Sequence, residues 1–375
     1  MKDRKLHLEN ISKAMENVGF NQAALARSLA VSRETVSKWL SGSAMPRPEK
    51  LLQLSRTLHL KFHDLVLASA PVSPVIAFRT NKKKKITEEK TINAKDMAEV
   101  LSIISPYCKS SVFSPVFRQQ PTLEYDYIQA VAHEVRVLLH PKDGVVDVDC
   151  ILNLYADFTV VLIPVLWGIN GDNGLYIHLP HQNMTFVYLN IEKPLVDVSF
   201  WALHELAHAM TKSMLSHDAE TFADHLSAAV LFPKELARAS YHEMDAIGSI
   251  AGKVQRINEI GLKQMISPFT VLGEMNKYAA HAQLVPIDVE IGGAATNLAK
   301  AIGLYRDKLF NDIPTAEEYV RVCTSTLNAS IFPAITEYLH ETGADVGIVQ
   351  RLLNIPIADA KGVHKVLVNQ KRNPS

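Results

Sequence analysis

The sequence is poor in cysteine and has no long apolar run. Its three cysteines (Cys108, Cys150 and Cys323) are far apart and odd in number, which argues against a disulfide framework and indicates reduced structural thiols. No stretch of about 18 consecutive apolar residues occurs, so the sequence predicts no membrane-spanning helix. The first residues, MKDRKLHLENISK, contain no apolar signal-peptide segment, so we expect a cytoplasmic protein without a membrane partner.

The formal net charge is zero, yet the charges are unevenly distributed. Residues 1–85 carry 16 Lys and Arg against 6 Asp and Glu, whereas the remainder carries 23 against 33. A basic N-terminal segment attached to an acidic remainder indicates a nucleic-acid partner for the first part only. A length of 375 residues and a hydrophobic content of 47% predict two or three domains with substantial cores.

Two short helices joined by a tight turn are predicted near the N-terminus. Asn21 has the side chain of an N-cap for a helix over 22–29, and Ser32 has that of an N-cap for a helix over 33–40. Ala30 and Val31 lie between the two helices, so the pair forms a helix-turn-helix. Further helices are expected over 7–18, 48–58 and 62–65.

Several side chains of this motif are free to face outward. They are of the types that reach base edges or phosphates in a major groove, so we predict DNA contacts from Gln22, Ser32, Arg33, Glu34, Ser37 and Lys38. The segment NQAALARSLAVSRETVSKWLSG resembles the Cro/CI-type (XRE) helix-turn-helix family, in which Ala30 is usually Gly. The resemblance implies binding to double-stranded DNA, with homodimerisation on two half-sites. The alternative is a helical bundle used for protein contacts.

The segment His204-Glu205-Leu206-Ala207-His208 is the chemically most informative part of the sequence. Residues four apart share one face of a helix, so His204 and His208 can bind one metal ion. Glu205 between them can act as general base on a metal-activated water, as in HExxH zinc peptidases. No Pro or Gly interrupts residues 199–213, and this favours a continuous helix.

Three apolar segments before this helix predict a small sheet. The strands are expected over 158–165, 175–179 and 184–190. In zincins such a sheet edge borders the metal, and a substrate backbone can add to it as an extra strand. His178, His181 and Tyr188 are candidates for stabilising an oxyanion.

A catalytic zinc site requires a third protein ligand. We predict Glu220 on the following helix, with Asp218 as its main rival and His217 or His225 as further alternatives. Asp224 lies one helical turn after Glu220, so it is expected to orient a metal-binding histidine. Two imidazoles and a carboxylate favour Zn²⁺, although Mn²⁺ could occupy such a set.

The segments HELAHAM and ETFADHLSAAVLFP resemble the ImmA/IrrE family of zinc metallopeptidases. Upstream, Phe78-Arg79, Tyr125–Ile128 with Arg136, and Ile163–Val165 resemble proteins that join an XRE module to this peptidase. The resemblance implies a gluzincin-like zinc endopeptidase that cleaves a regulatory protein such as a repressor. A regulator that uses the metal for sensing or stability without turnover is the alternative, and an antitoxin-like or phage-encoded regulator is a third possibility.

The expected architecture is multidomain and mainly α with a small β-sheet. An all-α helix-turn-helix domain over 1–68 is followed by a linker over 69–95. An α+β zincin-like metallopeptidase domain over 96–240 and a helical C-terminal region over 241–375 complete it.

Overall fold

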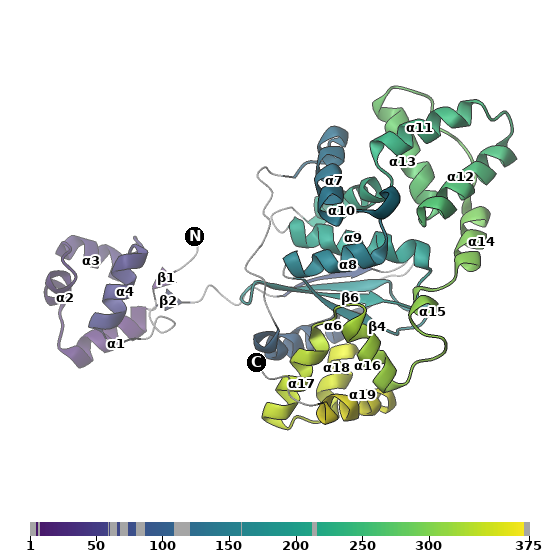
Figure 1. Ribbon diagram of the computed structural model, residues 1–375. Helices are drawn as coiled ribbons and strands as arrows, with labels where there is room; N and C mark the ends of the chain where they lie inside the picture. The colour runs from purple at the N-terminus through teal and green to yellow at the C-terminus, as the bar shows by residue number, and fades with distance from the viewer. Residues whose placement is uncertain are drawn as a thin grey trace. The chain divides into compact units, whose positions relative to one another are not determined.

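The computed structural model of the chain contains two compact units, Met1–Ser73 and Pro74–Ser375 (Figure 1). The described residues are 5–6, 8–58, 60, 66–67, 74–79, 87–108, 121–158, 160–211 and 216–370.

The first unit is built from four described helices, α1 (Leu8–Val18), α2 (Gln22–Ser28), α3 (Arg33–Leu40) and α4 (Pro48–Thr57). The Asn21 side chain accepts a hydrogen bond from the backbone N–H of Ala24 at 2.9 Å, and the Ser32 side chain accepts one from that of Thr35 at 3.1 Å. These two caps begin α2 and α3 as predicted. The core of this unit consists of residues such as Ile11, Leu25, Leu29, Val36, Trp39 and Leu54.

A small sheet corrects the all-α prediction for this unit. Strand β1 (Lys5–Leu6) pairs antiparallel with β2 (Val66–Leu67). Two-residue strands carry no readable alternation of polar and apolar residues, which is why periodicity did not reveal them. The helix expected over 62–65 lies outside the described residues.

The second unit is organised around a four-stranded mixed sheet with the order β3-β5-β6-β4. Strand β5 (Gly174–Leu179) pairs antiparallel with both β3 (Val75–Arg79) and β6 (Met184–Asn190), whereas β4 (Val160–Val165) pairs parallel with β6. All residues of β4 and β6 are buried. Apolar strands that are buried on both faces require helices on both sides of the sheet.

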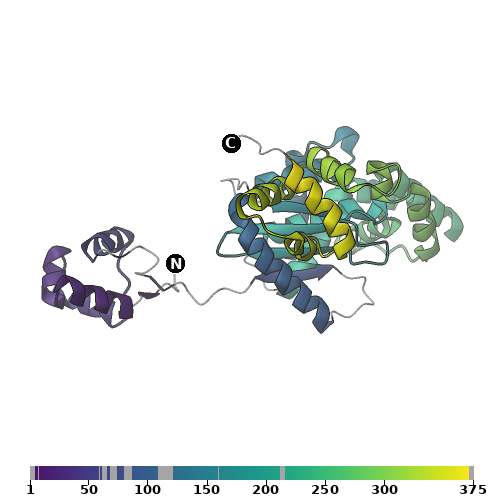
Figure 2. The same cartoon turned by 90° about the horizontal axis from the view of Figure 1, so that it is seen from below.

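Helices cover both faces, as Figure 1 shows. One face carries α7 (Tyr125–Leu139), α8 (Val148–Tyr155), α9 (Leu195–Met210) and α10 (Ser216–Leu231). The other carries α6 (Glu88–Ile104), α16 (Ala316–Ser325), α17 (Ile331–Thr342), α18 (Val346–Leu353) and α19 (Ile357–Asn369). Figure 2 looks onto this second face, where α6 and the C-terminal helices lie over the strands.

The remaining described elements extend or connect these layers. Helices α11 (Lys234–Asp245), α12 (Ile250–Gln264), α13 (Pro268–His281) and α14 (Gly292–Ile302) form a lobe beside α7 and α10, and α15 (Tyr305–Leu309) leads back to the sheet (Figure 1). Short 3₁₀ turns occur at Ser105–Tyr107, Lys142–Gly144 and Ala156–Phe158.

The sheet changes two of the expected domain boundaries. Strand β3 and the first half of α6 fall within the range 69–95 that was expected to be a linker, because the apolar run that begins at Val75 pairs with β5. The C-terminal helices belong to the same unit as α9, the helix that contains the HExxH segment. Tyr188 donates a hydrogen bond to the carbonyl of Leu352, and the Trp167 indole donates one to that of Leu353. These bonds join the sheet to the end of α18.

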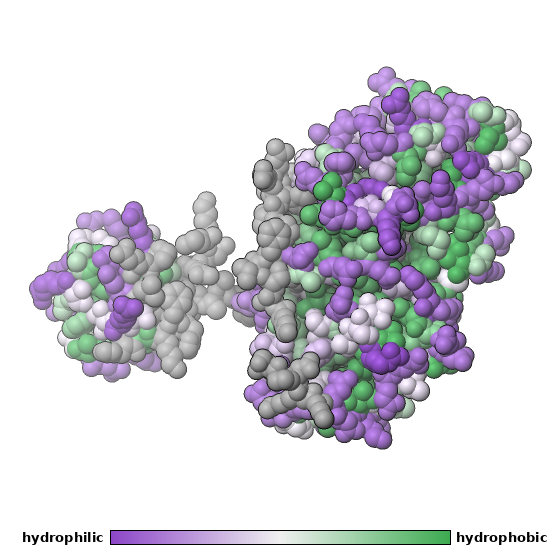
Figure 3. Space-filling view, viewed as in Figure 1, coloured by the Kyte–Doolittle hydropathy of each residue, from purple (hydrophilic) through white to green (hydrophobic). Residues whose placement is uncertain are grey.

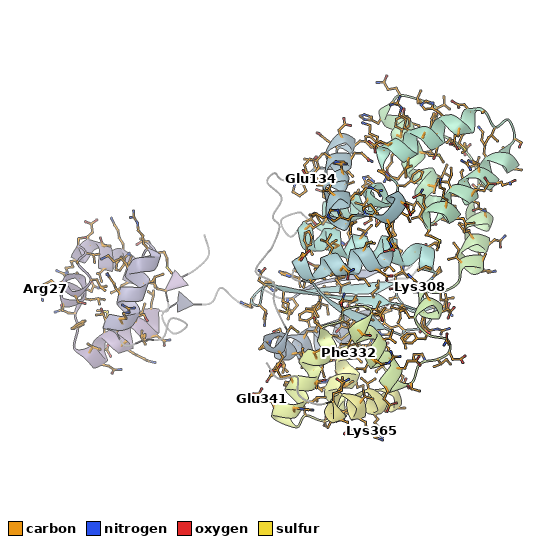
Figure 4. All side chains as sticks on the ribbon, in the orientation of Figure 1. Arg27, Glu134, Lys308, Phe332, Glu341 and Lys365 are labelled. Carbon is orange, nitrogen blue, oxygen red and sulfur yellow. The ribbon has the colours of Figure 1, made fainter. Side chains whose placement is uncertain are left out.

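Side-chain burial in the C-terminal helices follows their position on the sheet. Phe332 is fully buried beneath the strands, whereas Glu341 and Lys365 lie on the outer surface of this layer, and Arg27 is exposed on the first unit (Figure 4). Hydrophilic residues cover much of the visible surface of α11–α13 (Figure 3). None of the described helices is long and apolar enough to cross a membrane.

Candidate metal centre and nucleic-acid interface

The two histidines of the HExxH segment lie in a helix that is buried on nearly every side. In α9, every residue from Ala202 to Ala209 is buried, and α9 packs between α8, α10 and the sheet. His204 is fully buried and His208 is 8% exposed. Such burial of polar rings is costly unless they are hydrogen-bonded or bound to a metal, so the position of these histidines points to a function.

Helices α9 and α10 together assemble a set of metal-ligating atoms. The Nε2 atoms of His204 and His208 are 2.9 Å apart. Glu220 on α10 has one carboxylate oxygen 3.3 Å from Nε2 of His208 and the other 3.7 Å from Nε2 of His204. The ligand atoms of His204, His208 and Glu220 all lie within 4.8 Å of one another, and this is a group that could hold a metal ion.

The separations within this group match those of a tetrahedral zinc site. With Zn–N and Zn–O bonds of about 2.0–2.1 Å, two ligand atoms of a tetrahedral centre lie about 3.3 Å apart. The two Nε2 atoms are 2.9 Å apart, and one Glu220 oxygen is 3.3 Å from Nε2 of His208 while the other is 3.7 Å from Nε2 of His204, so these separations are close to that value. Two imidazole nitrogens and one carboxylate oxygen also leave one tetrahedral position for water or substrate. The residues therefore fit a zinc ion.

Asp224 places a carboxylate oxygen beside the outer nitrogen of His204. Its Oδ1 is 2.9 Å from Nδ1 of His204. With Nδ1–H donating to this carboxylate, the lone pair of His204 resides on Nε2, which faces His208 and Glu220. The rings of Phe200 and Trp201 both lie 6.2 Å from the His204 ring, measured between ring centroids. These two aromatic rings are therefore neighbours of the His204 ring.

Glu205 is directed toward the start of strand β5 and is only 1% exposed. A Cβ built on Gly174 would lie 3.9 Å from Oε1 of Glu205 and 2.7 Å from the carbonyl oxygen of Tyr188. The second distance is too short for any side chain, so glycine is required at position 174 by the backbone of β6, and the Glu205 carboxylate lies next to this glycine. The importance of this glycine could not be deduced from the sequence, because it depends on sheet register.

Two tyrosines lie close to the Glu205 carboxylate. Burial raises the pKa of Tyr155 well above its usual value, and the negative charge of Glu205 adds to the shift. Burial also raises the pKa of Tyr176, with a Thr185 hydrogen bond opposing the shift and Glu205 adding to it. The Tyr176 ring lies 5.6 Å from that of His208. Tyr176 is thus a site residue that sequence reasoning missed, although its place in a predicted strand before the metal helix was a usable signal.

The rival ligands are not part of this group. Among the described residues, the group contains neither Asp218 nor His225. His225 faces a separate cavity of about 230 Å³ that is also lined by Tyr125, Glu274 and His281. Burial and the charge of Lys277 lower the pKa of His225, and Asp224 opposes this shift. The side chain of His217 lies outside the described part of the chain.

The predicted oxyanion candidates have other neighbours. The Tyr188 hydroxyl points to the opposite face of the sheet, where it donates to Leu352 at 2.8 Å. Nδ1 of His178 lies 3.0 Å from the hydroxyl of Thr185, and His181 is exposed in the turn between β5 and β6.

The predicted DNA-contacting residues lie on and beside α3. Ser32, Arg33, Glu34, Ser37 and Lys38 are all exposed, and Gln22 at the start of α2 is half-buried. Lys38 and Glu34 form a 2.8 Å ion pair one turn apart on the surface, which contributes little to stability. Val36 and Trp39 face the core instead. The helix therefore presents one polar face to solvent.

The turn between α2 and α3 contains a strained residue. Ala30 has φ of 50°, in the left-handed region that favours glycine. This is the position at which the sequence differs from the XRE pattern. The backbone keeps the geometry of the turn despite the added Cβ.

Comparison with known proteins supports the N-terminal assignment. A family model described as helix-turn-helix matches residues 11–65. No curated protein and no solved structure matches the chain. The matched residues contain α2, the strained turn and the exposed face of α3. The first unit is therefore a helix-turn-helix domain that binds double-stranded DNA, and the chain is a DNA-binding transcriptional regulator.

Proposed function

We propose that this regulator carries a zinc-dependent endopeptidase in its second unit. The observation that carries the proposal is the convergence of His204, His208 and Glu220 within 4.8 Å, with Glu205 on the same buried helix. A purely structural zinc site is usually closed by four protein ligands and has no use for a neighbouring base. Three ligands with an adjacent carboxylate are the arrangement of a hydrolytic site.

The residues of the chain would have separate roles in hydrolysis. His204, His208 and Glu220 would hold the zinc ion, and Asp224 would orient His204. A bound zinc ion supplies a Lewis acid that lowers the pKa of water. Glu205 takes a proton from the attacking water and passes it to the leaving amine. The Tyr176 ring lies beside that of His208, and its phenol is protonated at neutral pH, so it can donate a hydrogen bond to a developing oxyanion.

The substrate class follows from the other unit and from the family resemblance. The HELAHAM and ETFADHLSAAVLFP segments resemble the ImmA/IrrE peptidases, which implies cleavage of a repressor or another regulatory protein. A helix-turn-helix domain on the same chain concentrates the peptidase near DNA-bound proteins. We infer that the regulator binds DNA as a homodimer, since such domains usually read two half-sites.

The test compares the zinc-loaded wild-type chain with zinc-loaded Glu205→Gln. Each is incubated with a cell extract, and newly formed protein N-termini are labelled and identified by mass spectrometry. The proposal predicts termini that are produced by the wild type and are absent with Glu205→Gln, although both proteins hold one zinc. The same termini from both proteins would contradict the role of Glu205. No termini from either would favour a regulator that uses its metal without turnover.

A further inference from the structure

Strand β5 is the part of the sheet that borders the metal centre. The Tyr176 ring is 5.6 Å from the His208 ring, and Gly174 faces the Glu205 carboxylate. These two residues are two positions apart in the strand, so they lie on the same face of the sheet, which is the face covered by α9. In the proposed peptidase, an extended substrate would gain its backbone hydrogen bonds most directly along the side of β5 that faces away from β6.

That side of β5 is already occupied by another segment of the same chain. Strand β3 pairs antiparallel with β5 over five residues, from Val75 opposite His178 to Arg79 opposite Gly174. Ala77 lies opposite Tyr176. Each side of a strand accepts one partner, because each backbone N–H and C=O on that side is used once. While β3 is paired, an incoming peptide cannot pair with β5 at these positions.

The position of β3 at the edge of the sheet favours its local opening. It forms the edge of the sheet, is five residues long, and begins with Val75, which is 51% exposed. Ile76 is only partly buried where it packs against the core beside Ile177. Short strands at the edge of a sheet open locally at a lower free energy than the whole domain. Release of β3 is therefore compatible with an intact second unit.

Strand β3 directly follows the DNA-binding unit in the sequence. The first unit ends at Ser73, and β3 begins at Val75. The segment that occupies the edge is thus the first structured segment after the DNA-binding unit, and the backbone connects the two.

We propose that β3 is an intramolecular strand that occupies the peptide-docking side of β5, so that a substrate reaches the metal centre along this strand only after β3 detaches. The inference rests on the proposed endopeptidase function, because the substrate backbone is its competitor. The partner of this surface is an extended peptide, and in the resting chain that peptide is Val75–Arg79. Control of the site is therefore exerted through the segment next to the DNA-binding unit.

The test measures peptide binding in full-length protein that carries Glu205→Gln, so that turnover does not interfere. The probe is a fluorescein-labelled peptide with the sequence of Pro74–Arg79, followed by fluorescence anisotropy. Ile76→Asp introduces a charge beside Ile177, which is fully buried, and should detach β3. Val75→Asp is the matched control, because it adds the same charge at an exposed position of the same strand. Faster amide exchange of residues 74–79 in Ile76→Asp verifies the release.

The expected result is at least tenfold tighter probe binding by Ile76→Asp than by the parent or Val75→Asp. A second variant, Ile76→Cys with Ile177→Cys, joins two residues that lie directly opposite each other. This disulfide should abolish probe binding, and reductant should restore it to the parental level. Equal probe affinity in all variants, despite faster amide exchange in Ile76→Asp, would overturn the inference. Because binding is measured without turnover, its outcome is independent of whether the chain cleaves peptide bonds.

Discussion

Asp224 Oδ1 lies 2.9 Å from Nδ1 of His204, so the carboxylate of one helix sets the tautomer of a ring on another. Helix α10 contributes both Glu220 and Asp224 from successive turns. One approaches the Nε2 side of the two histidines, and the other binds the outer nitrogen of His204. The packing of α10 on α9 therefore determines both the ligand set and its orientation.

Asp224→Asn should weaken zinc binding without removing a ligand. Loss of an outer-shell carboxylate typically costs 10- to 100-fold in metal affinity, and we expect a loss in this range. Competition with a chromophoric chelator at neutral pH measures it. Asp218→Asn on the same helix is the control, and its zinc affinity should stay within about twofold of wild type. Equal losses in the two variants would mean that general charge, not the His204 contact, is responsible.

Ala30→Gly should stabilise the helix-turn-helix unit. The left-handed conformation costs a residue with a Cβ about 1–2 kcal/mol, and the greater unfolded-state freedom of glycine offsets about 0.5–1 kcal/mol of this. We expect a net gain of about 0.5–1 kcal/mol, read from slower amide exchange in α2 and α3. Ala23→Gly, within helix α2, should instead destabilise the unit by about 1 kcal/mol. The same sign for both substitutions would contradict the assigned turn geometry.

Arg33→Ala should weaken DNA binding. Arg33 is exposed at the first position of α3, where a side chain can reach base edges or phosphates. We expect a loss of about tenfold or more, corresponding to at least about 1.4 kcal/mol, on a duplex selected by the wild-type chain from a random pool. Arg56→Ala removes an exposed arginine from α4 and should leave the affinity within about twofold. If Arg56→Ala is the more damaging change, α3 is not the recognition helix.

Asp197 should contribute stability to the second unit that is lost as the pH rises from about 4 to about 6. Burial raises the pKa of Asp197, in the first turn of α9, to about 6, and Lys193 opposes the shift. The folded state therefore retains a proton that the unfolded state has lost, and its stabilising effect disappears as the pH passes through this window. The contribution is at most about 3 kcal/mol.

Urea unfolding of Asp197→Asn and wild type across this pH range tests the prediction. The variant should lose less stability than the wild type between pH 4 and 6. Asp312→Asn, at an exposed position, should follow the wild-type profile. If Asp197→Asn also follows it, the aspartate does not titrate in this window.

The elements close to the metal centre were predictable because their signals are local. Strands β5 and β6 begin and end within one residue of the predicted ranges, since each is an apolar run between turn residues. The spacing of His204 and His208 required only helical periodicity. Glu220 and Asp224 were candidates because they lie four residues apart, and so on one face, of the helix that follows the HExxH segment.

The features that were not predicted depend on pairing between distant segments. That Gly174 lies beside Glu205, that Tyr176 lies beside His208, and that β3 fills the side of β5 are consequences of strand order and register. Likewise, the attachment of the C-terminal helices to the second face depends on contacts such as Tyr188 with Leu352, more than 150 residues apart. Local periodicity carries no information about such partners.

In the proposed site, His204, His208 and Glu220 together hold one metal ion. Native mass spectrometry of the full-length chain in zinc-buffered solution tests it most directly, with Glu220→Ala, His204→Ala and Asp218→Ala measured beside the wild type. We expect one zinc in the wild type and in Asp218→Ala, and none in His204→Ala or Glu220→Ala. A zinc ion that is kept by Glu220→Ala and lost from Asp218→Ala, or a wild-type chain that binds none, would contradict it.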